Sequence, residues 1–273
     1  MNNIVNLETV KEFTNGLNVT SSYVQDNRHS IVTDKFKVIQ PASVGHELSK
    51  LGFKCTSILT GKAKQVDKAD FQKTIARYRS TEKFEIDGLS LDIIYISKHM
   101  GRGTDELRLG LYRGVCANQW AVGTLFDMIK IRHSGNPLED IEVGITAILK
   151  QRNKLVTTIK AMQDRVLTKD EIELLARKYA SIRLQGKKNI IDADFKSLAQ
   201  IRRSDDAKID LFTVANVLQE NVIRFPMRYD MNSMDKNGQT IVRKQTTQIL
   251  KESSSQLVDM NGQFFDAAME LVA

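Results

Sequence analysis

Residues 62–84 combine the two kinds of side chain that a single nucleic-acid strand needs. Seven cations alternate there with three aromatic rings: Lys62, Lys64, Lys68, Lys73, Arg77, Arg79 and Lys83, and Phe71, Tyr78 and Phe84. Cations neutralise phosphates and exposed rings stack on bases, so the combination is typical of single-strand binding. From residue 70 onward, Phe71, Ile75 and Tyr78 follow a helical period, which predicts an amphipathic helix. If its aromatic side chains instead face the core, only a basic outer face remains.

A glycine-punctuated loop over 97–104 carries two further cations, Lys98 and Arg102. It follows directly on a strongly apolar strand pattern at 91–96. Such a loop presents backbone amides and cations to a phosphate. Its glycines are equally typical of a hairpin turn that needs positive φ. Both interpretations stay open at the level of sequence.

Catalytic and metal-binding patterns are scarce. The chain has no P-loop, no Gly-x-Ser-x-Gly elbow, no His-Glu-x-x-His and no Cys-x-x-Cys. Its four histidines (His29, His46, His99 and His133) lack metal-ligand spacing, and Cys116 lies in an apolar stretch typical of a small core residue. We therefore expect no catalytic residue, no metal and no cofactor. An enzyme would need His99, Cys116 and His133 to converge in one cleft.

Length and composition exclude several classes of protein. The chain has 273 residues, of which 41% are hydrophobic and 27% charged, an ordinary globular composition. No apolar run reaches the roughly 18 residues of a membrane span, and the first residues lack a signal-peptide pattern. Two cysteines provide no disulfide framework. These features predict a cytoplasmic protein that contacts no membrane, located in the host cytoplasm if a phage encodes it.

The charge balance favours a polyanion partner. The formal net charge is +7, and residues 50–83 hold nine basic and three acidic residues, a local net of +6. A basic stretch of this kind is the electrostatic footprint expected of nucleic-acid binding. The alternative is a solvated surface without a ligand.

The elements that must position these residues change in character near residue 138. Short apolar or alternating runs at 31–32, 36–39, 53–59, 91–96, 107–115 and 126–132 predict strands, with helices at 4–17 and 43–51. Helical periods follow at 139–165, after a capping box at Thr168–Glu171, at 207–223 and from Ile241 to Val272. We expect an α+β fold: a strand-rich region, 1–138, with an antiparallel or mixed sheet, and a helical region, 139–273, packed on it as one compact unit.

Several motifs resemble a known family. The stretch 89–136 runs from a strand into a Ser-Lys-His-Met-Gly loop, then an Arg-Gly-Val-Cys-Ala-Asn segment, then His-Ser-Gly. It resembles the phage- and plasmid-borne domain-of-unknown-function family numbered 932. The positions that match are His99, Gly101, Arg113, Val115, Cys116, Asn118, His133 and Gly135. The helix end Leu48–Phe53 and the segment Gln219–Ile223 are also similar to the family pattern.

The resemblance implies a mobile-element setting, that of a bacteriophage, and brings no activity with it. Ser97, Lys98 and Met100 replace the family loop's Asn, Ser and Asp, and Gln119 replaces a glycine. A role that needs the aspartate is therefore not carried over. At the level of fold, the chain also looks broadly like the annealing-protein superfamily of Erf and lambda Red beta. That likeness implies a homo-oligomeric ring without a cofactor.

Two functional hypotheses follow. The first is a phage or mobile-element protein that binds nucleic acid, namely single-stranded DNA, in recombination or replication. Its binding residues would be Lys62, Lys64, Lys73, Arg77, Tyr78, Arg79, Lys98, Arg102 and Arg113. The alternative is an interaction module that binds a host protein, such as a defence factor, with the C-terminal amphipathic helix as its apolar anchor.

Overall fold

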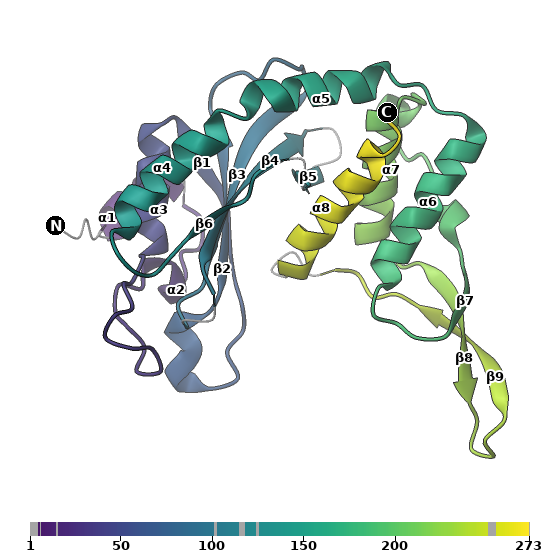
Figure 1. The fold of residues 1–273 in the computed structure, drawn as a ribbon, viewed down its shortest axis with the longest axis horizontal. Coiled ribbons are helices and arrows are strands. Elements are labelled where there is room, and N and C mark those ends of the chain that lie inside the picture. Colours follow the sequence, from purple (N-terminus) through teal and green to yellow (C-terminus); the bar gives the residue numbers. More distant parts are fainter. Residues whose placement is uncertain are drawn as a thin grey trace. The chain divides into compact units, whose positions relative to one another are not determined.

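The chain forms two compact units, each with its own antiparallel sheet (Figure 1). The computed structural model describes residues 5, 7–14, 16–100, 103–114, 118–123, 126–250 and 255–272. The first unit comprises residues 1–114, 124–154 and 252–255, and the second comprises 115–123, 155–251 and 256–273. Antiparallel sheet with separate helices is the α+β class that the sequence predicts.

The sheet of the first unit contains the strands that the sequence pattern predicts at 53–59, 91–96 and 107–115. Strands β1 to β4 lie in sequence order and each is antiparallel to the next, while β6 pairs with β4. Their bounds are β1 Phe53–Thr60, β2 Thr74–Ser80, β3 Leu89–Ser97, β4 Asp105–Arg113 and β6 Ile129–Ile131. Because β3 and β4 are antiparallel neighbours, the glycine-punctuated segment between them connects a hairpin.

The helix expected from residue 70 is wrong. Residues 74–80 form β2, between β1 and β3, and only a short 3-10 helix, η1 (Val66–Phe71), precedes it. The spacings of four and three residues between Phe71, Ile75 and Tyr78 are helical, but residues 74–78 are buried on both faces of β2, so this strand shows no alternation by which it could be recognised. Pairing on both edges with neighbouring strands favours the extended form here.

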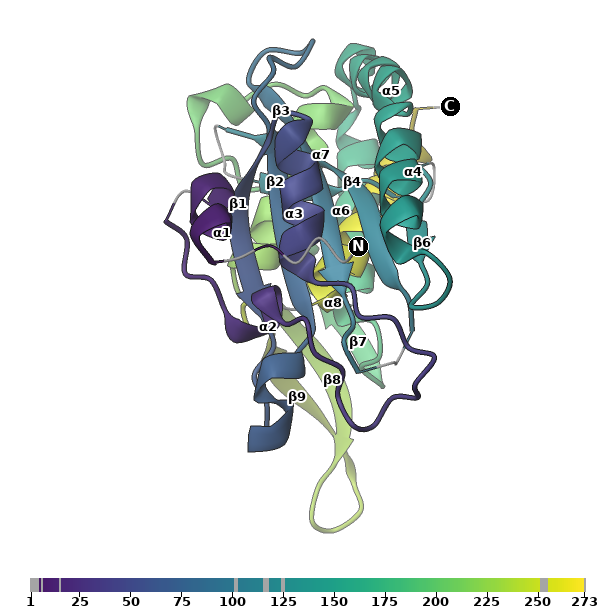
Figure 2. The same cartoon turned by 90° about the vertical axis from the view of Figure 1, so that its left-hand side faces the viewer.

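Helices cover one face of this sheet (Figure 2). They are α1 Leu7–Thr14, α2 Ser21–Val24, α3 Pro41–Lys50 and α4 Pro137–Leu149. Gly45 of α3 lies where an added Cβ would be 2.5 Å from the Tyr23 hydroxyl oxygen and 2.9 Å from that of Tyr78. Only glycine therefore fits where the helix crosses these two buried rings.

The second unit is built around four helices and a small sheet. The helices are α5 Arg152–Asp164, whose first turn belongs to the first unit, α6 Lys169–Leu184, α7 Leu211–Arg224 and α8 Ser255–Met269. The strands are β5 Asn118–Ala121 and the sheet β7 Ile190–Ala193, β8 Arg228–Met234 and β9 Thr240–Thr246, in that order. Two 3-10 helices, η2 Phe195–Ala199 and η3 Ser204–Asp206, precede α7. The single helical pattern at 139–165 is thus divided into α4 and α5.

Aromatic contacts form the core of the second unit. Tyr179 of α6 stacks on Phe264 of α8, with ring centroids 4.5 Å apart. Trp120 donates a hydrogen bond to Asn216 of α7 and meets Phe265 edge-on. The apolar residues of α8 are therefore buried within the second unit, whereas the host-protein hypothesis uses this face as an anchor. The predicted capping box at the start of α6 is confirmed.

The pair β8–β9 is a hairpin that the sequence pattern does not reveal. Residues from Ile241 onward show a helical spacing, yet 240–246 form β9, and α8 begins only at Ser255. All seven residues of β9 are exposed, so no buried face imposes the alternation by which a strand is recognised. No helix in the described part of the chain is both long and apolar enough to cross a membrane.

Candidate nucleic-acid interface

Tyr78, the predicted stacking ring, lies in the core. Its side chain is fully buried on the helix-covered side of β2, and its hydroxyl shares a 2.8 Å hydrogen bond with that of Tyr23. Burial raises the pKa of Tyr78 well above its ordinary value. Tyr78 therefore offers no ring face to a base, and the core interpretation of this residue holds.

Arg77 and Arg79 lie on the opposite side of β2 and are engaged within the sheet. Arg77 is buried, at 4% exposure. Arg79 donates two hydrogen bonds to Asp92, at 2.9 and 3.2 Å, and its guanidinium carbon lies 3.2 Å from the centroid of the Tyr112 ring. Burial raises the pKa of Asp92, and Arg79 opposes that rise by stabilising the carboxylate. These arginines are therefore part of the packing on this face of the sheet, and they do not form a phosphate site.

Lys98 forms an ion pair within the first unit, and Arg113 is buried there. The Lys98 ammonium lies 2.5 Å from a Glu106 carboxylate oxygen, and Arg108 binds the other oxygen of that carboxylate. Burial opposes ionisation of Glu106, but the two cations outweigh it and lower its pKa. Arg113 is buried at the end of β4. Arg102 lies outside the described residues.

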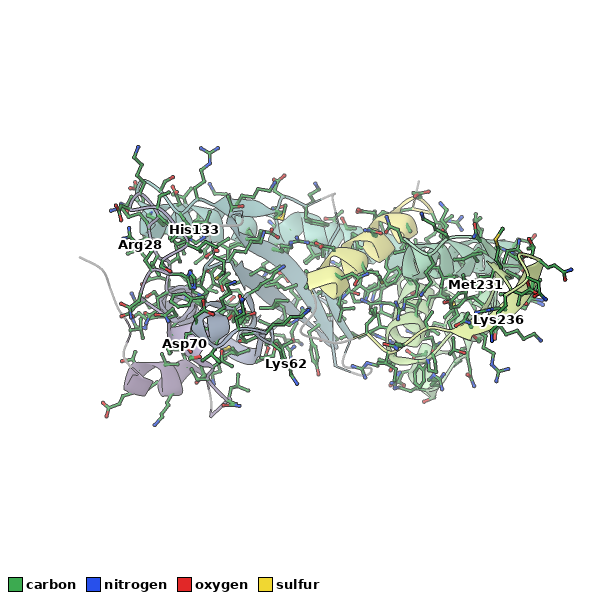
Figure 3. The ribbon with its side chains drawn as sticks, turned by 90° about the horizontal axis from the view of Figure 1, so that it is seen from below. Arg28, Lys62, Asp70, His133, Met231 and Lys236 are labelled. Atoms are coloured by element: carbon green, nitrogen blue, oxygen red, sulfur yellow. The ribbon has the colours of Figure 1, made fainter. Side chains whose placement is uncertain are left out.

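The remaining predicted cations lie on the connection between β1 and β2. Lys62 and Lys64 are exposed and Lys73 is half-buried. Figure 3 shows Lys62 and Asp70 on this connection. The structure therefore does not gather those of the nine predicted residues that it describes into one surface, and Lys62 and Lys64 are the exposed ones among them.

A groove in the second unit gathers cations that the sequence analysis does not single out. It has a volume of about 700 Å³ and lies between α6, η2 and the small sheet. Lys196, Arg228 and Lys244 line it, all exposed, and none forms an ion pair with another residue that the structure describes. Arg177, Phe195 and Tyr229 also line it, together with the carboxylates of Asp192, Asp194 and Asp230.

Strand register and a short capped turn place these cations. Arg228 on β8 lies opposite Thr246 of β9, and Lys244 on β9 lies opposite Asp230 of β8. Lys196 belongs to η2, whose N-cap Asp194 accepts a hydrogen bond from the Ser197 amide. The hairpin continues beyond the groove to a turn that carries Lys236 (Figure 3). The strand pattern does not indicate this hairpin, but its turn carries a local signal that the sequence analysis did not use, Asn237-Gly238, with Gly238 at φ +79°.

A buried carboxylate in the first unit brings together two of the four histidines. Asp105 accepts hydrogen bonds from the Lys98 amide at 2.7 Å, from His133 Nε2 at 3.0 Å and from the Tyr95 hydroxyl. Burial lowers the pKa of His99. The charge of the nearby Asp105 raises this pKa, and that of His133 lowers it. Of the three residues that an enzyme would need, Cys116 lies outside the described residues.

The contacts of His133 join two loop segments to the start of β4. The Nδ1 atom of His133 lies 3.0 Å from the Lys37 carbonyl oxygen, and that oxygen only accepts hydrogen bonds. Nδ1 therefore donates to this carbonyl, and Nε2 donates to Asp105 when the ring is protonated. Burial lowers the pKa of His133, but the hydrogen bond to Asp105 and its charge outweigh burial, so the pKa is raised. Among the described residues, no group of three or more His, Cys, Asp or Glu side chains could hold a metal ion.

Comparison with known proteins identifies the family. The chain is similar to "UPF0380 protein YafZ" and "UPF0380 protein YfjQ" of Escherichia coli (strain K12). Each is 23% identical over 207 residues, which cover 76% of this chain and 74% of the relative. No solved structure matches the chain significantly. The family model described as "Domain of unknown function (DUF932)" matches residues 28–255, well over half of the chain. The chain therefore belongs to the DUF932 family.

Proposed function

We propose that this protein binds nucleic acid, single-stranded DNA, through the groove of the second unit. The observation that carries the proposal is the set of three exposed cations, Lys196, Arg228 and Lys244, around one cavity of about 700 Å³. A setting in the recombination or replication of a mobile element is a further proposal, and it rests on the family resemblance alone.

The charges of the groove suit a chain of phosphates better than a single anion. Its three free cations come from η2, β8 and β9, so they are spread along the groove. Each cation that neutralises a phosphate releases condensed counterions, which makes the affinity fall with added salt. The three aspartates of the lining keep the net charge low. We therefore expect binding of moderate affinity that depends strongly on salt.

The test is fluorescence anisotropy with a labelled single strand and the matching duplex over a series of salt concentrations. The variant Arg228→Glu/Lys244→Glu reverses two groove cations. A matched control, Lys160→Glu/Lys169→Glu, makes the same change of charge at exposed positions of α5 and α6 away from the groove. Circular dichroism establishes that both variants remain folded.

We expect the wild-type protein to bind the single strand more tightly than the duplex. In the groove variant the logarithmic salt slope should shrink by about 1.4, which corresponds to about 0.7 for each lost phosphate contact. The control variant should keep the wild-type slope. Equal affinities of the groove variant and the wild type would overturn the proposal, as would negligible wild-type binding at low salt.

A further inference from the structure

Arg177 lies over an aromatic ring at the wall of the groove. Its guanidinium carbon is 3.7 Å from the centroid of the Phe195 ring, so the guanidinium is in contact with the face of that ring. Glu173, one helical turn earlier on α6, accepts hydrogen bonds from its Nε at 3.1 Å and from its Nη2 at 2.7 Å. Contact with the ring and the two hydrogen bonds to Glu173 hold the guanidinium in place.

The other face of the guanidinium plane remains available to a ligand. The Arg177 side chain is 54% exposed, whereas Phe195 beneath it is 8% exposed. Arg177 also lines both the large groove and a second cavity of about 410 Å³ beside it. The exposed part of Arg177 therefore borders the space that the three free cations surround.

We propose that Arg177 is the platform on which this groove stacks a nucleic-acid base, an inference that rests on the proposed function. Bases splayed out of a single strand stack on aromatic rings and on guanidinium planes. A base in a duplex keeps both faces covered by its neighbours and has none to offer. Arg177 thereby makes the groove prefer single strands, while Lys196, Arg228 and Lys244 hold the phosphates.

The ion pair of Arg177 with Glu173 distinguishes base stacking by Arg177 from phosphate binding by the three free cations. Its charge is already balanced by a carboxylate, 2.7 Å away. What Arg177 contributes beyond the three free cations is a flat and oriented surface. Lysine at this position keeps the charge and still reaches Glu173 in the same i, i+4 arrangement, but it has no plane.

The chain contains a matched control for this arrangement. The guanidinium carbon of Arg202 lies 3.6 Å from the centroid of the Phe225 ring, and its Nε donates to the Asn221 side chain at 2.7 Å. Arg202 is exposed in the same unit but does not line the groove. Arg177→Lys and Arg202→Lys therefore make the same chemical change inside and outside the proposed site.

The experiment compares wild type, Arg177→Lys and Arg202→Lys by anisotropy on two labelled strands of equal length. One is oligothymidine of about 20 nucleotides, and the other is an abasic strand that has the same phosphates but no bases. We expect Arg177→Lys to bind oligothymidine about tenfold more weakly, with an unchanged salt slope. On the abasic strand, Arg177→Lys and wild type should bind equally. Arg202→Lys should match wild type on both strands.

Each of the other outcomes has a definite meaning. Unchanged affinity of Arg177→Lys for oligothymidine overturns the platform and leaves the groove in place. An equal loss on both strands also overturns it, because the abasic strand reports phosphate contacts alone. If wild-type protein binds neither strand, the proposed function fails and the platform fails with it.

Discussion

His133 donates a hydrogen bond to Asp105 across 3.0 Å, and this contact ties a loop to the end of the β3–β4 hairpin. The carboxylate is fully buried, and the second nitrogen of His133 donates to the Lys37 carbonyl. Phe36 stacks on the His133 ring, with ring centroids 4.2 Å apart. The His133 ring therefore joins the segment 36–37 to the sheet.

The stability of the protein should depend on the protonation of His133. Burial alone lowers its pKa, but the hydrogen bond and the charge of Asp105 outweigh burial, so the folded pKa lies above the ordinary value. Stabilisation by a group of this kind is complete below its unfolded pKa, about 6.5, and is lost as the pH rises through the folded pKa. In urea denaturation, the difference between wild type and His133→Gln should be largest below about pH 6 and shrink above it. A difference that grows with pH would contradict a raised pKa of His133.

The protonation of His99 should change the stability of the protein in the opposite direction to that of His133. Burial lowers its pKa, against the opposing effect of Asp105, so the unfolded chain takes up the proton first as the pH falls. Stability that depends on neutral His99 is therefore lost below its unfolded pKa of about 6.5. Replacing His99 by Gln should flatten the acid limb of the curve of stability against pH. An acid limb as steep in His99→Gln as in wild type would argue against this assignment.

Gly45→Ala should destabilise the first unit. The added methyl would lie 2.5 Å from the Tyr23 hydroxyl oxygen and 2.7 Å from a Phe13 ring carbon, both in the core. Overpacking of this kind costs about 1–3 kcal/mol of unfolding free energy. Gly61→Ala is the control, because its methyl would meet no atom closer than 3.5 Å. Equal denaturation midpoints for the two variants would show that α3 shifts to accommodate the methyl group.

Arg79→Met should cost about 3–5 kcal/mol, because it leaves the fully buried Asp92 without the guanidinium it binds. Lys62→Met and Lys64→Met, which change exposed cations, should stay within about 0.5 kcal/mol of wild type. Thermal or chemical unfolding measures the change in unfolding free energy for each of the three variants. A small loss for Arg79→Met would mean that Asp92 is protonated in the folded protein, since its pKa is raised by burial.

Asp210→Ala should loosen the start of α7. Its carboxylate accepts hydrogen bonds from the Thr213 amide at 2.9 Å and from the Thr213 hydroxyl at 2.8 Å. Loss of such a cap costs about 1 kcal/mol. Asp210→Asn keeps an accepting oxygen and should recover most of that loss in the same denaturation experiment. Equal stabilities for wild type and Asp210→Ala would show that the cap contributes nothing measurable.

Local signals account for the parts of the fold that were predictable. The Thr168–Glu171 capping box, the strand pattern at 91–96 and the family motifs each depend on a few neighbouring residues. Strand β2 was harder to predict, because Phe71, Ile75 and Tyr78 follow a helical spacing while residues 74–78 are buried on both faces of the strand and show no alternation. Pairing with β1 and β3 makes this segment extended. Hairpin β8–β9 was missed because exposure at every position of β9 removes the alternation.

The candidate site was harder to predict than the fold. Charge predicts exposure on average, so Arg77 and Arg79 read as surface cations. Asp92, the partner of Arg79, lies on the next strand, and only strand pairing brings the two together. The groove likewise joins Lys196, Arg228 and Lys244 from three elements separated by up to 48 positions in sequence. No local pattern could report that proximity.

Strand β9 is the last strand of its sheet, so one of its edges presents backbone amides and carbonyls outward. Such an edge is a template on which a second chain can add a strand, the first step of fibril-like association. Arg243 and Lys244 lie in the middle of β9, and like charges facing each other across a new strand pair repel. Salt screens this repulsion, with a Debye length of about 3 Å at 1 M. Arg243 and Lys244, of which Lys244 also lines the groove, therefore oppose pairing of two copies along this edge, and we expect such pairing to be weakest at low salt concentration.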